Sequence, residues 1–239
     1  MAIATRILAV IPARANSKRI KGKNLKKLGG KPLVCYTIEA ALRSRLLDRI
    51  VISTDIDEMP RIAARYRSRR LEVLRRAPEL CGDRVTTEQV LIDAVEKLGL
   101  RRALEAVVTL LPTSPFRTPG IIDGCIRLFR ARKADSVVTM SRMKLKIADL
   151  DEATGRLHVR KEYMPAAMHK VPLTLCENPA LHMTRLETLL RGRYTLGERN
   201  YGYEIDRVTG MDINDPIEWA LAEAVLEKGL VKSSGTSRT

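Results

Sequence analysis

Short apolar runs alternate with helical patterns over the first 140 residues, and this alternation is compatible with few architectures. A continuous apolar run such as Ile7–Ile11 is typical of a strand that is covered on both faces. The runs that we interpret as strands are Ile7–Ile11, Arg49–Ser53, Leu71–Leu74, Ala106–Leu111 and Ser136–Met140. Strands that alternate with helices favour a doubly wound sheet with ligand sites at the carboxyl ends of strands. We therefore expect a three-layer α/β fold with a mostly parallel, Rossmann-like sheet.

Helix-start signals follow most of these runs. Pro32 predicts a helix start soon after the first basic loop. Thr86 and Gln89 have the spacing of a capping box, and Thr118 precedes a proline where another helical pattern begins. Asp215 is interpreted as an N-cap, because Pro216 follows it directly and Glu218 lies three positions after it.

The alternation breaks between about residues 141 and 183, where the chain contains a hairpin-like stretch around Asp151–Gly155 and two further prolines. We interpret residues 141–183 as an insertion with antiparallel strands. Alternation returns with a short helix at Thr184–Arg191 and a strand at Tyr203–Ile205. The expected organisation is one α/β domain, residues 1–140 and 184–230, with the insertion between its parts. Residues 231–239 are expected to be a disordered polar tail.

The chain is strongly basic, with a net charge of +15. Acidic residues accompany the basic ones, however, and aromatic residues make up only 4% of the chain, too few for a base-stacking platform. This pattern favours an enzyme that handles anions over a protein that binds nucleic acid.

Other compositional features bear on the compartment. No apolar run is long enough to span a membrane, and Met1–Arg6 lack the pattern of a secretion signal. The four cysteines show no CxxC spacing, which fits a reducing cytosol, and the three histidines form no metal-ligand pattern. We expect a cytoplasmic protein.

The first apolar run leads directly into a cationic loop. Five basic residues follow it within ten positions: Arg14, Lys18, Arg19, Lys21 and Lys23. Such a loop at a strand end suits a triphosphate, because its cations and backbone N–H groups can neutralise the anion. Ser17 and Asn24 can add hydrogen bonds. The alternative is a solvated charged loop, and neither a P-loop nor a dinucleotide fingerprint is present.

Polar side chains follow two further strands. Asp55 ends the second strand, where it either orients a ribose or base or caps the next helix. Thr113, Ser114 and Arg117 lie in a stiff turn after a later strand and could face the same cleft as the cationic loop. The alternative for this turn is a rigid connection that only feeds the next helix.

A candidate metal site lies near the end of the chain. Asp212 and Asn214 share one side of an extended segment, because alternate residues of such a segment face the same way. Two oxygen donors fit Mg²⁺, which takes few protein ligands together with substrate phosphates.

Together these segments resemble the acylneuraminate cytidylyltransferase family, which includes CMP-sialic acid synthetases and their legionaminate and pseudaminate relatives. The stretches that carry the resemblance are Ile11–Asn24, Ser53–Asp55, Arg76–Leu80 with Asp83, Leu111–Arg117 and Met211–Asp215. They occur in the family's order between about residues 7 and 225.

The resemblance implies transfer of CMP from CTP to the anomeric hydroxyl of an acidic keto-sugar, with release of pyrophosphate. It implies the fold of the nucleotide-diphospho-sugar transferases and a homodimer in which the inserted segment reaches over the partner's active site. Arg14, Lys23 and Asp212 would be the catalytic residues, and Asp212 with Asn214 would hold Mg²⁺. The nucleotide-binding residues would be Arg14, Ser17, Lys18, Lys23, Asn24, Arg76, Thr113 and Ser114.

The chain departs from the family mainly on the acceptor side. Leu111 replaces a glutamine beside the sugar site, Asn214 replaces the second aspartate of the metal motif, and an expected arginine falls near Cys176. The acceptor therefore need not be N-acetylneuraminate. Either Lys170 or His169 replaces the missing arginine as partner of the sugar carboxylate, or both are surface residues. Alternative functions are another sugar-nucleotide pyrophosphorylase, such as a keto-deoxyoctonate cytidylyltransferase, or a non-catalytic nucleotide-binding homologue.

Overall fold

A seven-stranded sheet forms the centre of the molecule in the computed structural model, which describes residues 7–145, 147–160, 163, 170–192 and 197–231. The strands are β1 (Ile7–Ala13), β4 (Arg49–Thr54), β5 (Leu71–Arg75), β6 (Ala106–Thr109), β7 (Ser136–Lys144), β10 (Leu173–Arg185) and β11 (Asn200–Glu204). Their order is β11-β7-β10-β6-β1-β4-β5. All neighbours pair in parallel except β10, which is antiparallel to both β6 and β7. The prediction of a mostly parallel Rossmann-like sheet is confirmed.

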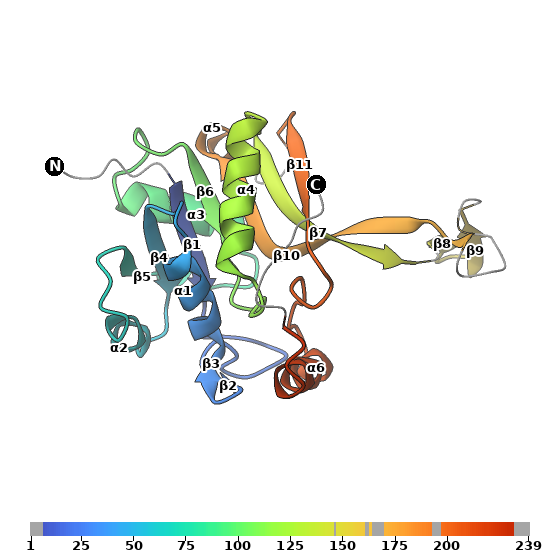
Figure 1. Cartoon of the computed structure of the whole chain (residues 1–239), viewed down its shortest axis with the longest axis horizontal. Coiled ribbons are helices and arrows are strands. Elements are labelled where there is room, and N and C mark those ends of the chain that lie inside the picture. The colour runs from blue at the N-terminus through green and yellow to red at the C-terminus, as the bar shows by residue number, and fades with distance from the viewer. Residues whose placement is uncertain (1–6, 146, 161–162, 164–169, 193–196, 232–239) are drawn as a thin grey trace.

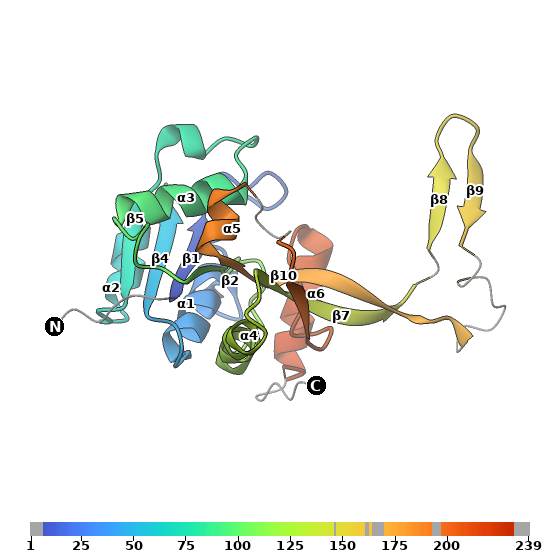
Figure 2. The ribbon, with the colours of Figure 1, turned by 90° about the horizontal axis from the view of Figure 1, so that it is seen from above.

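Helices cover both faces of the sheet (Figure 2). Alternate residues of β1 explain the two layers, since Ile7, Ala9 and Ile11 pack on one face while Leu8 and Val10 pack on the other. The helices of the first face are α1 (Leu33–Arg43), α2 (Met59–Ala64) and α4 (Pro119–Ala131), and those of the second are α3 (Thr87–Lys97) and α5 (Leu186–Leu190). No helix among the described residues has the length and apolar character needed to traverse a bilayer.

The predicted helix caps are confirmed. Thr86 accepts a hydrogen bond from the Gln89 backbone N–H at 3.3 Å, and the Gln89 side chain accepts one from the Thr86 N–H at 2.9 Å. Thr118 caps α4, and Asp215 caps α6 (Pro216–Glu227) through two N–H groups at 2.9 Å. Each cap satisfies backbone donors that have no partner inside the helix, and so fixes where the helix begins.

Strands β7 and β10 continue beyond the sheet as a two-stranded arm (Figure 1). Near the arm's end lies a hairpin of β8 (Ala148–Asp151) and β9 (Arg156–Val159), as predicted around Asp151–Gly155. No strand boundary lies at residue 141, because β7 runs on to Lys144, and β10 runs from the arm into the sheet as far as Arg185. The expected helix at Thr184 therefore begins at Leu186. The predicted tail 232–239 and His169 lie outside the described residues.

Shorter elements complete the chain: the hairpin of β2 (Lys27–Leu28) and β3 (Lys31–Pro32), and a 3₁₀ turn at Pro78–Leu80. Helix α6 packs on this side of the molecule, where Trp219 joins an apolar cluster with Ile20, Leu28 and Ile213. This cluster connects the start of α6 to the loop that follows β1.

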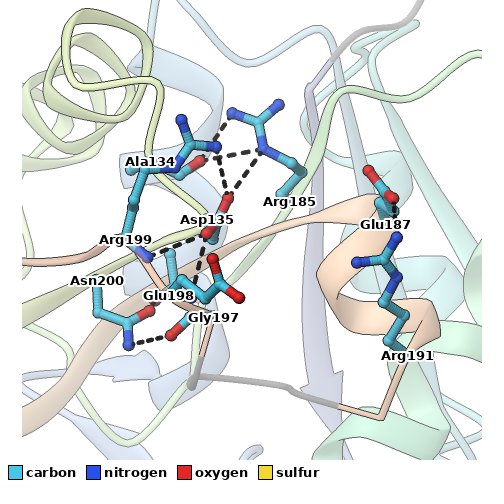
Figure 3. Close-up of polar contacts among 10 residues, drawn as sticks. Ala134, Asp135, Arg185, Glu187, Arg191, Gly197, Glu198, Arg199 and Asn200 are labelled. Atoms are coloured by element: carbon cyan, nitrogen blue, oxygen red, sulfur yellow. Dashed lines mark hydrogen bonds and ion pairs between the residues drawn. The ribbon is translucent and has the colours of Figure 1, made fainter.

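An ionic anchor joins three neighbouring strands at the end of the sheet where β7 begins (Figure 3). Asp135 precedes β7 and pairs with Arg199, which precedes β11, at 3.0 Å, and with Arg185 at the end of β10 at 3.6 Å. The hydrogen bond from the Arg199 side chain is the main cause that lowers the pKa of Asp135. The strands are thus fixed at the end remote from their predicted ligand side.

Candidate active site

The loop after β1 is held in place by hydrogen bonds of side chains of the loop and of Asp55, which follows β4. Asp55 accepts a hydrogen bond from the Ala15 N–H at 2.7 Å, and the Asn24 side chain donates to the Arg14 carbonyl at 2.8 Å. Lys23 donates to the Ile213 carbonyl at 2.8 Å. Asp55 therefore anchors the loop. The prediction that it caps the next helix is wrong, because Glu58 occupies the N-cap position of α2.

This loop forms one wall of a cleft of about 260 Å³ at the carboxyl end of β1, which we call the cationic cleft. The predicted site residues that line it are Arg14, Ser17, Lys18, Lys23, Asn24, Thr113 and Asn214. Arg19 and Leu111 line it as well. Four basic side chains around one hollow of this size are suited to a polyphosphate.

One carboxylate neutralises part of this charge. Asp83 pairs with Arg14 at 3.0 Å and with Lys18 at 2.7 Å. The hydrogen bond from Lys18 is the largest cause that lowers the pKa of Asp83, and Arg14 adds to it. Asp83 is half exposed, so an entering anion can compete for both cations.

Arg76 lies in a second hollow of about 260 Å³, the Arg76 cleft, which shares Arg14 and Leu111 with the cationic cleft. Its guanidinium is buried and donates to the Ser53 carbonyl at 2.7 Å and the Ser53 hydroxyl at 3.2 Å. Burial lowers the pKa of Arg76 from its ordinary value. The structure thus brings the predicted nucleotide-recognition residue next to Arg14, on the other side from Lys23.

A third hollow of about 370 Å³ lies beside the cationic cleft, and we call it the Asp212 pocket. Asp212 accepts a hydrogen bond from the Asn214 side chain, as their predicted shared side requires. The other carboxylate oxygen of Asp212 is buried and has no hydrogen-bond partner among the described residues. Burial lowers the pKa of Lys23, and the charge of Asp212 opposes this shift, so the ammonium and the carboxylate act on each other.

The side chains of the turn after β6 do not all face the cleft. Thr113 lines the cationic cleft, but Ser114 is fully buried and lines none of the three hollows. Arg117 is also buried, and it donates to the carbonyls of Ala180 at 2.5 Å and Leu111 at 2.8 Å. Of the two alternatives for this turn, the buried side chains of Ser114 and Arg117 fit the rigid connection, because both turn into the protein and not into the cleft. Arg117 instead fixes the turn that presents Thr113.

Comparison with known proteins decides the family. The sequence model of the family described as Cytidylyltransferase matches residues 8–162. The chain belongs to this cytidylyltransferase family. It is a nucleotidyltransferase, and the matched residues include the cationic loop, Arg76 and the turn at Thr113.

Curated relatives extend the match over most of this cytidylyltransferase. The chain is 31% identical over 230 residues to "CMP-N,N'-diacetyllegionaminic acid synthase" of Legionella pneumophila, covering 93% of this chain and 97% of the relative. It is 28% identical over 239 residues to "N-acylneuraminate cytidylyltransferase" of Escherichia coli, of which it spans about half, 53%.

Solved structures share the fold. A CMP:2-keto-3-deoxy-manno-octonic acid synthetase complexed with CTP superposes with a TM-score of 0.68 over 94% of this chain and 100% of that one, at 15% identity. A 4-diphosphocytidyl-2C-methyl-D-erythritol synthase from Anaerococcus prevotii has a TM-score of 0.66 at 14% identity, over 94% of this chain and 97% of that one.

Two polar residues of this cytidylyltransferase were missed by sequence reasoning as members of the site. Asp83 stood inside a quoted motif but received no role, and its spacing from the cationic loop gave no sign of the ion pairs. Arg207 lines the Asp212 pocket. In a chain with 43 lysines and arginines, no pattern separated it from the other exposed basic residues.

Proposed function

We propose that this cytidylyltransferase transfers CMP from CTP to the anomeric hydroxyl of an acidic keto-sugar of the sialic acid type and releases pyrophosphate. The observation that carries the proposal is the junction of two hollows. Asn214 lines the cationic cleft, which is suited to a triphosphate, Asp212 lines the Asp212 pocket, and a hydrogen bond joins these two side chains. The name of the Legionella relative, a CMP-N,N'-diacetyllegionaminic acid synthase, supports this acceptor class.

In the proposed reaction, the anomeric oxygen bonds to the α-phosphorus, and the bond from that phosphorus to the bridging oxygen breaks. Pyrophosphate leaves with the electron pair of the broken bond. Arg14, Lys18 and Lys23 neutralise the phosphates, while Arg76 lies where the nucleoside end extends past Arg14. Such a transfer asks little covalent chemistry of the protein, so its rate depends on positioning and on charge stabilisation.

We propose Mg²⁺ as the metal of the reaction, held by Asp212 with Asn214. The buried oxygen of Asp212 that has no partner among the described residues is suited to a hard cation. The described residues contain no group of three or more His, Cys, Asp or Glu side chains that could hold a metal. Mg²⁺ tolerates so few protein ligands because substrate phosphates and water complete its shell. When bound, the ion would neutralise charge on the phosphates.

Asp212→Asn is expected to raise the Mg²⁺ concentration that gives half-maximal rate by about 10- to 100-fold, the scale of one lost interaction with a charged group. Titration of pyrophosphate release with Mg²⁺ measures this. Asp57→Asn is the matched control, because Asp57 is an exposed aspartate whose ion pair among the described residues is with the exposed Arg75. Equal Mg²⁺ dependence of the two variants would place the metal elsewhere.

The lining of the Asp212 pocket favours one acceptor class over another. Met143, Met211 and Leu221 contribute apolar surface to it, which complements the acyl substituents of an acylated sugar better than the hydroxyl groups of an octulosonate. The second candidate is a keto-deoxyoctonate cytidylyltransferase, favoured by the fold of its solved counterpart.

The function is tested by pyrophosphate release with CTP, ATP, GTP and UTP against three acceptors. These are N,N'-diacetyllegionaminate, N-acetylneuraminate and 3-deoxy-manno-octulosonate. We expect turnover with CTP and the highest kcat/KM with an acylated nine-carbon acid. Preference for the octulosonate would favour the second candidate. No turnover with any pair of nucleotide and acceptor would favour the hypothesis of a non-catalytic nucleotide-binding homologue.

We also propose a homodimer in the cytoplasm. The arm and its hairpin expose the apolar side chains of Leu145, Leu150, Leu157, Leu173 and Leu175, which a second copy would cover. The four free cysteines suit a reducing compartment. Light scattering at micromolar concentration is expected to give twice the monomer mass of 26.8 kDa, and a mass near 26.8 kDa would contradict the dimer.

A further inference from the structure

We propose that Arg207 binds the carboxylate of the acceptor sugar in the Asp212 pocket and so selects acidic sugars. The inference rests on the proposed function, whose acceptor is an acid. Arg207 is the sole basic residue that lines this pocket in the described part of the chain.

The acidic side chains around the pocket already have partners. Glu218 accepts hydrogen bonds from the backbone N–H groups of Asn214 at 2.5 Å and Asp215 at 3.2 Å. A carboxylate oxygen of Glu177 lies 3.0 Å from His182 Nε2. Asp212 faces Lys23 and Asn214. Glu218 is therefore engaged with the backbone, and Asp212 is engaged through one of its two carboxylate oxygens.

Arg207, by contrast, has no hydrogen bond or ion pair with any other described residue. Its side chain is exposed, so its five N–H donors are open to a ligand. A guanidinium with open donors presents a planar fork that matches a carboxylate bidentately. Arg207 thus gives this pocket a cationic side chain with open donors, beside acidic residues that line it as well.

The backbone that carries Arg207 is fixed. Asp206 accepts hydrogen bonds from the N–H groups of Val208 and Thr209, both at 3.0 Å, and its carbonyl accepts one from Gly210 at 2.9 Å. Thr209 is buried beneath this turn. A rigid turn that ends the connection from β11 holds the position of a recognition residue better than a mobile loop does.

Of the two residues predicted for this role, the structure describes one. Lys170 is exposed and does not line the Asp212 pocket. His169 lies outside the described residues. Arg207 is therefore the candidate that the described geometry supports.

Sugar binding tests the inference directly. Titration calorimetry with N,N'-diacetyllegionaminate and N-acetylneuraminate, in the presence of CMP, compares the wild type with Arg207→Gln and Arg61→Gln. Arg61 is the matched control, since it is an exposed arginine on α2 that lines none of the three hollows. Arg207→Gln is expected to weaken binding of the better acid by about 10- to 100-fold, the loss typical of a hydrogen-bonded charge. Arg61→Gln is expected to bind as the wild type does.

Two readouts separate recognition from a structural role. The methyl ester of the same sugar is expected to bind wild type and Arg207→Gln equally, because the ester lacks the carboxylate charge. In turnover, the acceptor KM is expected to rise while the CTP KM changes less than about twofold, and Arg207→Lys is expected to recover part of the loss. Equal binding of the acid by wild type and Arg207→Gln would overturn the inference even where CTP turnover is normal. Failure of turnover with normal, Arg207-dependent sugar binding would instead count against the proposed function.

Discussion

Arg14→Ala is expected to lower kcat/KM for CTP by about 10²- to 10³-fold, the scale of removing one charge-stabilising donor from a preorganised site. Arg14 lines both the cationic cleft and the Arg76 cleft, so it faces the region where phosphates and nucleoside would join. Its side chain is partly exposed and contributes no apolar packing to the core, so the fold should persist. Initial rates of pyrophosphate release against CTP concentration measure the effect.

Lys21→Ala provides the matched control, because Lys21 belongs to the same loop, is exposed and lines none of the hollows. It removes the same net charge and is expected to change the rate less than about threefold, since distant exposed charges are screened by salt. Arg14→Lys should retain part of the activity, because it keeps the charge and loses the fork. Equal rates for Arg14→Ala and Lys21→Ala would refute the triphosphate role of the loop.

Arg117→Met is expected to destabilise the protein by about 3 to 5 kcal/mol, because several buried acceptors lose their donor at once. The guanidinium donates to the carbonyls of Ala180, Leu111 and Ser114 and to the Thr37 hydroxyl. Burial lowers the pKa of Arg117, yet an arginine stays protonated at neutral pH. The charge is thus stabilised by neutral acceptors on α1, the turn and β10.

Urea unfolding with a two-state analysis measures this loss. The control is Arg127→Met, on the exposed side of α4, which is expected to change the free energy of unfolding by less than about 0.5 kcal/mol. Because Arg117 supports the turn with Thr113, residual Arg117→Met protein should also bind CTP more weakly. Matching unfolding midpoints for the two variants would show that the buried hydrogen bonds contribute little.

Much of the fold was predictable because its signals are local. Continuous apolar runs gave the buried strands, and the caps at Thr86, Thr118 and Asp215 depend on one residue and its near neighbours. The path of β10 was not predictable in this way. It starts in the exposed arm and ends between β6 and β7, so its apolar pattern changes along its length, and its partners are fixed by long-range pairing.

The site residues also separate into those that local sequence predicts and those that depend on the tertiary structure. Arg14, Lys18 and Lys23 lie in one basic loop at the end of a strand. Their place in the same cleft could therefore be predicted from the sequence. The directions of Ser114 and Arg117 depend on the geometry of a turn, which residue types in a stiff segment leave open. Arg207 and Asp83 were recognised as residues of the site only from the tertiary structure, in which segments distant in the sequence lie close together.

The carboxylate of Asp83 acts as an internal counter-ion for the basic side chains of the cationic cleft. An incoming triphosphate does not meet bare cations, since it must exchange with a carboxylate already paired to Arg14 and Lys18. We infer that singly charged anions displace it poorly, because they replace one partner of the two cations without adding charge, whereas a polyphosphate brings several charges to the same hollow. Competition of chloride and triphosphate against bound CTP would measure this selectivity, and equal potency of the two anions would rule it out. A protein with a net charge of +15 can in this way make the cationic cleft less accessible to the abundant small anions of its surroundings.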